Sequence, residues 1–371
     1  SHGVTGFAVR VGVNTGHIAS GGFSEAANTI MGLDVNLAAR LESAAPPGGL
    51  LISHFTYRQV RGLFDVTPLE PIQVKGFPEP VKVYVVRQIK PHAFRMATRG
   101  VEGLETRMIG REAEFDRLKA AFTSLISEGG TQVVTVIGEA GVGKSRLVYE
   151  FENWVEMRPE RVYYFKGRAT ANRRTVALGL FRDLFAFRFG ILESDAAAVA
   201  LDKFRDGIIA ARRPDGERLS KAQADIIGHW LGFDFSESPS VANLLGSPQF
   251  GATARVYLVA YFRALAQNQP TIIFLEDIHW ADARSLELVR WLASALEEPV
   301  GRRVSLLLVC LARPVLYEEI TDWDANIPRF QRIDLTPLDQ ADNHDLVDEI
   351  LRHVEDVPEA LRELIANRAE G

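Results

Sequence analysis

One eight-residue segment, Gly138–Ser145, constrains the fold of this chain more than any other. It reads Gly-Glu-Ala-Gly-Val-Gly-Lys-Ser and matches G-x-x-x-x-G-K-[ST] at every fixed position. An apolar run at 132–137 precedes it, and a helix is predicted over 144–156 directly after it. Glycines here let successive backbone N–H groups point inward at a phosphate, and the helix N-terminus adds partial positive charge. The segment therefore predicts a nucleotide-binding domain built on a buried parallel sheet.

Two side chains of this segment carry most of its expected chemistry. Lys144 is expected to reach the β- and γ-phosphates, and the Ser145 hydroxyl can bind Mg²⁺ or Mn²⁺. The predicted nucleotide-binding residues are Gly138, Glu139, Ala140, Gly141, Val142, Gly143, Lys144 and Ser145.

A phosphate-binding loop of this kind needs an acidic partner on a neighbouring strand. The apolar run 271–275 ends in Glu276 and Asp277, which places two carboxylates at the carboxyl edge of a sheet. One is expected to hold the metal ion with Ser145, and the other to polarise an attacking water. Because Glu precedes Asp, the pattern leaves open which residue does which, and both are predicted metal ligands. Arg313 follows another apolar run, 304–312, where it could sense the γ-phosphate or form a surface salt bridge.

Three separated motifs occur in a characteristic order: MIGRE at 108–112, the glycine-rich loop, and LEDIHWAD at 275–282. Together they resemble the signal-transducing ATPases with numerous domains, which are AAA-related switches of large bacterial regulators. The resemblance covers about residues 108–371. It implies ATP as ligand, slow hydrolysis, and switching of an attached effector.

The first 86 residues form a second α/β pattern with its own candidate site. Asn36 and Arg40 stand four residues apart on a helix predicted over 34–44, so they share one face. An amide beside a guanidinium suits a ribose and a charged phosphate, although a solvated helix face is the alternative interpretation.

The surrounding segments 9–16, 32–42, 47–53 and 74–76 resemble the C-terminal half of the class III adenylate/guanylate cyclase catalytic domain, over residues 7–86. The resemblance implies that Asn36 orients the ribose and that Arg40 stabilises the transition state. It implies Lys75 as a second cation for the triphosphate and Thr29 as the residue that reads the base. ATP and GTP both remain possible substrates.

This resemblance also has departures. The two metal-binding aspartates of the family and its adenine-reading lysine belong N-terminal to the segment present here. The family builds each site across a dimer, so this chain is expected to supply one half-site, to form a homodimer, and to be inactive alone. Asp34 stands where the family usually has a small residue.

These patterns together predict an α/β chain. A partial ferredoxin-like α+β cyclase module at 1–86 and a linker at 87–107 precede a P-loop ATPase domain with a parallel sheet at 108–335. A truncated helical extension follows at 336–371. The strands expected at the end of the first module are 72–74 and 81–86.

Composition limits the remaining function classes. The net charge of −6 excludes a globally basic nucleic-acid binder, so no direct nucleic-acid partner is expected. No apolar run reaches the roughly 18 residues of a membrane helix, and a cytoplasmic location is expected. The single cysteine, Cys310, excludes a disulfide framework.

Two function classes remain. The first is a signalling nucleotidyl cyclase that makes cyclic AMP and pyrophosphate from ATP under control of the ATPase switch. The second is an inactive cyclase-like dimerisation module attached to an ATPase scaffold or transcriptional regulator.

Overall fold

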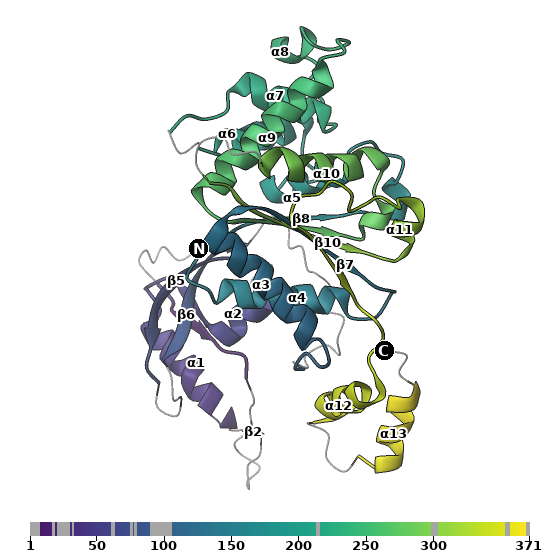
Figure 1. The fold of residues 1–371 in the computed structure, drawn as a ribbon. Coiled ribbons are helices and arrows are strands. Elements are labelled where there is room, and N and C mark those ends of the chain that lie inside the picture. The colour runs from purple at the N-terminus through teal and green to yellow at the C-terminus, as the bar shows by residue number, and fades with distance from the viewer. Residues whose placement is uncertain are drawn as a thin grey trace. The chain divides into compact units, whose positions relative to one another are not determined.

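The protein was analysed as a computed structural model, which describes residues 8–16, 19–20, 30–31, 33–60, 64–74, 77, 80–89, 106–212, 216–297, 303–352 and 357–368. The chain divides into two compact units, Ser1–Arg95 and Met96–Gly371 (Figure 1). Both mix helices with sheets, which confirms the predicted α/β class. No helix in the described ranges has the length and apolar character needed to cross a membrane.

The N-terminal unit is a four-stranded mixed sheet in the order β1-β4-β6-β5. Strands β1 (Val11–Val13) and β4 (Leu50–Ser53) are parallel, whereas β6 (Val81–Ile89) is antiparallel to both β4 and β5 (Phe64–Ile72). A short ribbon is formed by β2 (Ala19–Ser20) and β3 (Ile30–Met31). Helix α1 (Leu33–Ala44) buries its apolar side in a core that includes Leu51, Val83 and Val85, and α2 (His54–Val60) follows β4.

Strand β5 corrects the prediction of a strand over 72–74. It begins eight residues earlier, at Phe64, and ends at Ile72. Its sequence contains Pro68 and Pro71, which argue against a central strand because proline cannot donate a ladder hydrogen bond. The strand lies at the edge of the sheet, where this loss is tolerated.

The C-terminal unit has a five-stranded sheet in which every neighbouring pair is parallel. Its order is β11 (Phe330–Asp334), β7 (Gly130–Ile137), β10 (Ser305–Ala312), β9 (Thr271–Glu276) and β8 (Tyr163–Arg168). Strand β10 therefore separates β7 from β9. The expectation that the acidic strand neighbours the P-loop strand was wrong, because local apolar patterns do not encode strand order.

Helices cover both faces of this sheet (Figure 1). On one face lie α3 (Glu112–Glu128) and α4 (Lys144–Glu156), and on the other α5 (Gly179–Phe189) and α10 (Ala283–Glu297). A helical subregion adds α6 (Ala197–Ile209), α7 (Lys221–Trp230), α8 (Pro239–Ala242) and α9 (Phe250–Asn268). Its fully buried Phe204 and Phe262 belong to the same core cluster as Phe185 of α5 and Phe165 of β8. Single turns η1 (Ala171–Arg173) and η2 (Ile278–Trp280) follow β8 and β9.

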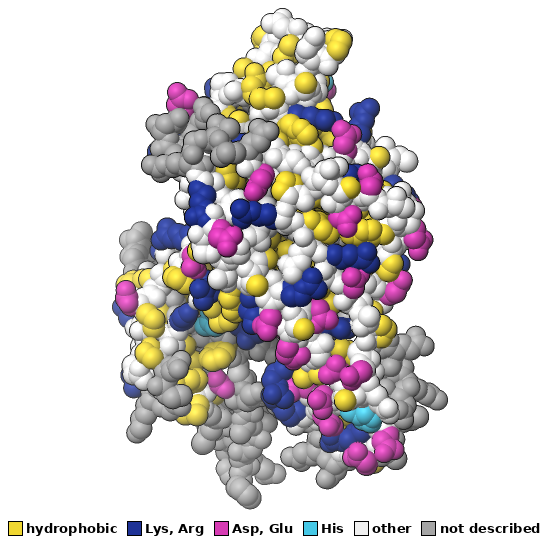
Figure 2. Space-filling view, in the orientation of Figure 1, with side chains coloured by type: hydrophobic (Ala, Val, Ile, Leu, Met, Phe, Trp, Pro, Cys, Tyr) yellow, Lys and Arg dark blue, Asp and Glu magenta, His cyan; other side chains and the backbone are white. Residues whose placement is uncertain are grey.

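The last part of the unit begins after β10 with α11 (Val315–Glu319) and, beyond β11, continues into α12 (Gln340–Leu351) and α13 (Glu359–Arg368). Basic and acidic side chains are interspersed over the face that Figure 2 shows, so the described surface in that view carries no broad field of one sign.

Both ends of the predicted linker, 87–107, have a defined structure, since β6 runs to Ile89 and the described chain resumes at Thr106.

Candidate functional site

The loop that follows β7 has a backbone that only glycine adopts readily. Gly141 and Gly143 have φ values of +95° and +97°, in the left-handed region. A Cβ at either position would meet nothing within 4 Å, so the requirement there is conformational and not steric. At Gly138 the requirement is space, because a Cβ would lie 2.7 Å from Cγ2 of Val142 and 2.9 Å from the carbonyl oxygen of Leu335. Helix α4 begins immediately afterwards at Lys144.

Lys144 lies folded over this loop. Its Nζ donates to the carbonyl oxygens of Gly138 and Glu139, at 2.6 Å in each case. Burial lowers the pKa of Lys144, the negative charge of Asp277 opposes that shift, and the positive charge of Arg313 adds to it. The ammonium therefore lies within electrostatic reach of the ends of β9 and β10. Ser145 is exposed beside it.

The two carboxylates after β9 have different environments. Glu276 is 6% exposed, and its Oε1 has no hydrogen-bond partner among the described residues. Burial raises the pKa of Glu276 to about 7. Asp277 has a left-handed backbone, with φ of 53°, and its Oδ2 accepts from Nε and Nη2 of Arg168 at 3.0 and 2.9 Å. One acid is thus buried with an oxygen that has no hydrogen-bond partner among the described residues, and the other is held by a guanidinium from the neighbouring strand.

Arg313 and His279 meet between these elements. Because β10 lies between β7 and β9, its last residues lie between the P-loop and the acidic pair. The backbone N–H of Arg313 donates to Nδ1 of His279 at 3.4 Å. His279 is 3% exposed, and burial lowers its pKa. The structure thus gathers Lys144, Asp277 and Arg313 around one edge of the sheet, and the roles expected of them stay predictions.

Sequence reasoning missed two residues of this site, Arg168 and His279. His279 belongs to the LEDIHWAD motif, so the motif itself was the available signal. Arg168 ends β8, and its register partner on β9 is Glu276. The pairing of these two strands was not readable from local sequence.

The donor atoms at this edge fit a hard divalent cation. The hydroxyl of Ser145, the unpartnered Oε1 of Glu276 and the carboxylate of Asp277 are all oxygen donors, which Mg²⁺ prefers. The described residues contain no cluster of three or more His, Cys, Asp or Glu side chains suited to a metal. A Mg²⁺ ion that keeps water and phosphate ligands needs only one or two protein carboxylates.

The candidate residues of the N-terminal unit are presented differently. Asn36 and Arg40 are both exposed on α1, while Leu37 and Leu41 of the same helix are fully buried. The helix therefore anchors one side in the core and turns its amide and guanidinium outward. Thr29 and Lys75 lie outside the described residues.

Asp34, which the family comparison left unexplained, is part of a polar network at the start of α1. The Asn14 amide donates to Oδ1 and to the carbonyl oxygen of Asp34 at 2.9 and 3.2 Å. The Ser53 hydroxyl donates to Oδ1 of Asn14 at 2.6 Å. A Cβ at Gly16 would collide with the Asp34 carboxylate. The network ties the start of α1 to the ends of the parallel strands β1 and β4.

Comparison with known proteins identifies both units. The family model for the AAA ATPase domain matches residues 107–309, and the model for the adenylate and guanylate cyclase catalytic domain matches residues 1–88. An uncharacterised protein of Rhizobium meliloti (strain 1021) is 26% identical over 313 residues, which is 84% of this chain and 28% of that protein. A receptor-type adenylate cyclase of Trypanosoma congolense is 36% identical over 95 residues, which is 24% of this chain and 13% of that protein.

Among solved structures, the adenylyl cyclase CyaB from P. aeruginosa is 43% identical over 21% of this chain and 42% of that chain, with a TM-score of 0.20. The chain spans less than a third of the length of the Rhizobium meliloti and Trypanosoma congolense proteins. It belongs to the AAA ATPase domain family and carries that domain C-terminal to an adenylate and guanylate cyclase catalytic domain.

Proposed function

We propose that this chain is part of a signalling nucleotidyl cyclase that converts ATP into cyclic AMP and pyrophosphate, with its AAA ATPase domain as an ATP-dependent switch. The observation that carries the switch is the arrangement of Lys144, Glu276 and Arg313 at one edge of the parallel sheet, where Oε1 of Glu276 is buried with no hydrogen-bond partner among the described residues. The cyclase part is supported by the family match over 1–88 and by the trypanosome relative, whose name is that of an adenylate cyclase.

In the ATPase unit, the backbone N–H groups of the loop and Lys144 would bind the β- and γ-phosphates. We assign Glu276 and Ser145 to the Mg²⁺ ion, because Oε1 of Glu276 is buried and has no partner in the described structure. A bound Mg²⁺ would neutralise phosphate charge. Asp277, held by Arg168, would orient and polarise the attacking water, and Arg313 would respond to the γ-phosphate.

In the cyclase unit, the 3′-oxygen of the ribose attacks the α-phosphorus while the bond from that phosphorus to the pyrophosphate oxygen breaks. The proton of the 3′-hydroxyl passes to solvent. Asn36 would orient the ribose and Arg40 would counter charge developing on phosphate, with Lys75 as a second cation and Thr29 reading the base. Because Asn36 and Arg40 are exposed, they could act on a triphosphate held by a second copy of the chain.

A cyclase assay tests this proposal. The 371-residue chain and a chain extended upstream of Ser1 would each receive Mn²⁺ with ATP or with GTP. We expect cyclic AMP from the longer chain and none from the shorter one. A folded, ATP-binding dimer of the longer chain that makes no cyclic nucleotide would instead support the inactive dimerisation module on an ATPase scaffold.

A further inference from the structure

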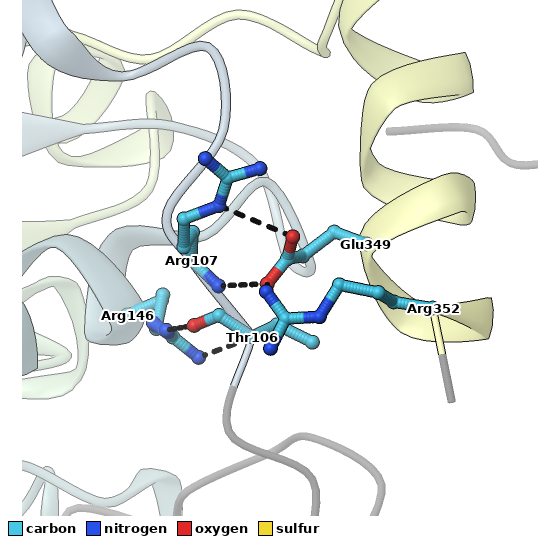
Figure 3. Close-up of polar contacts among 5 residues, drawn as sticks. All are labelled: Thr106, Arg107, Arg146, Glu349 and Arg352. Carbon is cyan, nitrogen blue, oxygen red and sulfur yellow. Dashed lines mark hydrogen bonds and ion pairs between the residues drawn. The ribbon is translucent and has the colours of Figure 1, made fainter. Parts of the chain in front are cut away.

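The segment 106–111, which we call the strap, leads from the predicted linker into α3 and is held by residues of α12. The backbone N–H of Arg107 donates to Oε1 of Glu349 at 3.0 Å, and its Nε donates to Oε2 at 3.1 Å (Figure 3). The Glu349 side chain, from α12, is only 3% exposed. Arg352 adds an ion pair to Oε1 at 3.4 Å. A buried carboxylate with these partners is strongly destabilised if the strap leaves it.

The same stretch of the strap is held from the opposite direction by the P-loop helix. Nη1 of Arg146 donates to Oγ1 of Thr106 at 3.3 Å, and its Nη2 donates to the carbonyl oxygen of Thr106 (Figure 3). Arg146 directly follows Ser145, the last residue of the phosphate-binding loop. Adjacent residues of the strap therefore contact the helix that begins at the P-loop and the helix that begins the C-terminal pair.

The other end of the strap repeats this double attachment. Arg111 is 6% exposed, and its Nη2 donates to the carbonyl oxygens of Val142 in the P-loop, at 3.1 Å, and Thr336, at 2.5 Å. Gly110 has φ of +65°, and the Asp342 carboxylate of α12 lies so close that a Cβ would collide with it. The strap thus joins α12 to the start of α4 at one end and to the P-loop at the other.

We propose that the strap is the joint through which nucleotide at the P-loop controls the docking of α12–α13 and signals to the linker. A shift of the loop or of the start of α4 on phosphate binding would move Arg146 and the carbonyl of Val142, and with them Thr106 and Arg111. The strap would then change its contact with Glu349. This inference rests on the proposed ATP switch and adds a route by which its state reaches the first described residues of the ATPase unit, at the end of the predicted linker.

Thermodynamic linkage gives the inference a sign. The docked strap is hydrogen-bonded to Arg146 and to the carbonyl oxygen of Val142, so it restrains the loop and the start of α4. In this arrangement Lys144 lies near Asp277 and Arg313, and docking should therefore favour ATP binding. Coupling between two such equilibria is reciprocal and is worth about 5- to 150-fold in affinity. Releasing Glu349 should therefore weaken ATP binding, and ATP should strengthen the contact between Arg107 and Glu349.

The test compares two neighbouring residues of α12 in the full chain. Glu349→Gln leaves the helix intact but turns an amide or a neutral oxygen toward the Arg107 donors. Asp348→Asn is the matched control, because Asp348 pairs with Arg362 of α13 and not with the strap. Calorimetry with Mg-ATP should show affinity lowered at least about 5-fold in Glu349→Gln and unchanged within twofold in Asp348→Asn. Hydrogen exchange at the Arg107 amide should slow when Mg-ATP is added to the wild type.

A folded Glu349→Gln chain with wild-type ATP affinity overturns the inference, as does an Arg107 amide whose exchange ignores ATP. If Glu349→Gln does not fold, Arg107→Ala decides. Its side chain is 76% exposed and its backbone N–H remains, so a smaller loss of affinity in the same direction is expected. A wild-type chain that does not bind ATP defeats the proposed switch itself, which separates the two failures.

Discussion

The two units present their candidate residues in opposite ways. In the ATPase unit, the ends of three parallel strands and the start of one helix bring Lys144, Glu276 and Arg313 to a single edge, where burial changes the pKa of the first two. In the cyclase unit, Asn36 and Arg40 lie exposed on a helix whose other side is in the core. An edge of this kind can bind a ligand by itself, whereas an outward-facing pair needs a second surface to complete a site.

The largest effect is expected for Lys144→Ala in the ATPase unit. We expect it to abolish measurable Mg-ATP binding by the 371-residue chain, because Lys144 is the cation of the only complete phosphate-binding motif that the sequence contains. Calorimetry measures this directly. Lys119→Ala, which removes an exposed ion pair with Asp116 on α3, is the matched control and should bind like the wild type. Unchanged affinity in Lys144→Ala would move ATP binding elsewhere in the molecule.

Arg40→Ala examines the outward-facing pair. In a chain extended upstream of Ser1, its cyclase rate should fall by roughly 10²- to 10³-fold, the range for one lost transition-state donor. Arg87→Ala is the control in the same unit, since Arg87 donates only to Thr67 on the neighbouring strand among the contacts described here. A rate within threefold of wild type would remove Arg40 from the mechanism, and ATP binding at the P-loop should not change in either variant.

The sequence was most informative where one local segment fixes the backbone. The P-loop glycines specify their own conformation, and α4 begins at Lys144 and ends at Glu156, as predicted. Strand order was not predictable, because the position of β10 between β7 and β9 depends on contacts between segments far apart in the chain. For the same reason the Arg168–Asp277 ion pair, which joins residues 109 apart, was missed. Most of β5 was not predicted, because its two prolines argue against a strand in the middle of a sheet. Proline is tolerated in an edge strand, and the position of β5 at the edge was not readable from local sequence.

The polar network at Asp34 allows the stability of the cyclase unit to be changed alone. Asp34→Ala removes the side-chain acceptor of the Asn14 amide, leaves the backbone acceptor, and should cost about 1–2 kcal/mol. Asp34→Asn keeps a side-chain oxygen there and should cost less. All five tryptophans, at 154, 230, 280, 291 and 323, lie in the ATPase unit. Asp34→Ala should therefore shift a denaturation transition seen by circular dichroism and leave the tryptophan fluorescence transition unchanged. A shift in the fluorescence transition would show that the two units unfold together.

An effect of similar size, confined to high pH, is expected for the buried carboxylate of the ATPase unit. The folded pKa of Glu276 is about 7, above its ordinary value of 4.5, so the unfolded chain releases this proton first. Wild-type stability should consequently fall as the pH rises from about 4.5 to above 7, and Glu276→Gln should remove that loss.

In metal-free buffer at pH 8, Glu276→Gln should therefore be more stable than the wild type by roughly 1–2 kcal/mol, read from the tryptophan transition. The two proteins should converge below pH 4.5. Glu128→Gln, at a side chain that is 64% exposed, is the control and should change stability by less than about 0.5 kcal/mol. Equal stabilities of Glu276→Gln and wild type at pH 8 would mean that the carboxylate is solvated. The contrast between a buried, self-contained ATPase edge and an exposed cyclase pair would then lose its electrostatic basis.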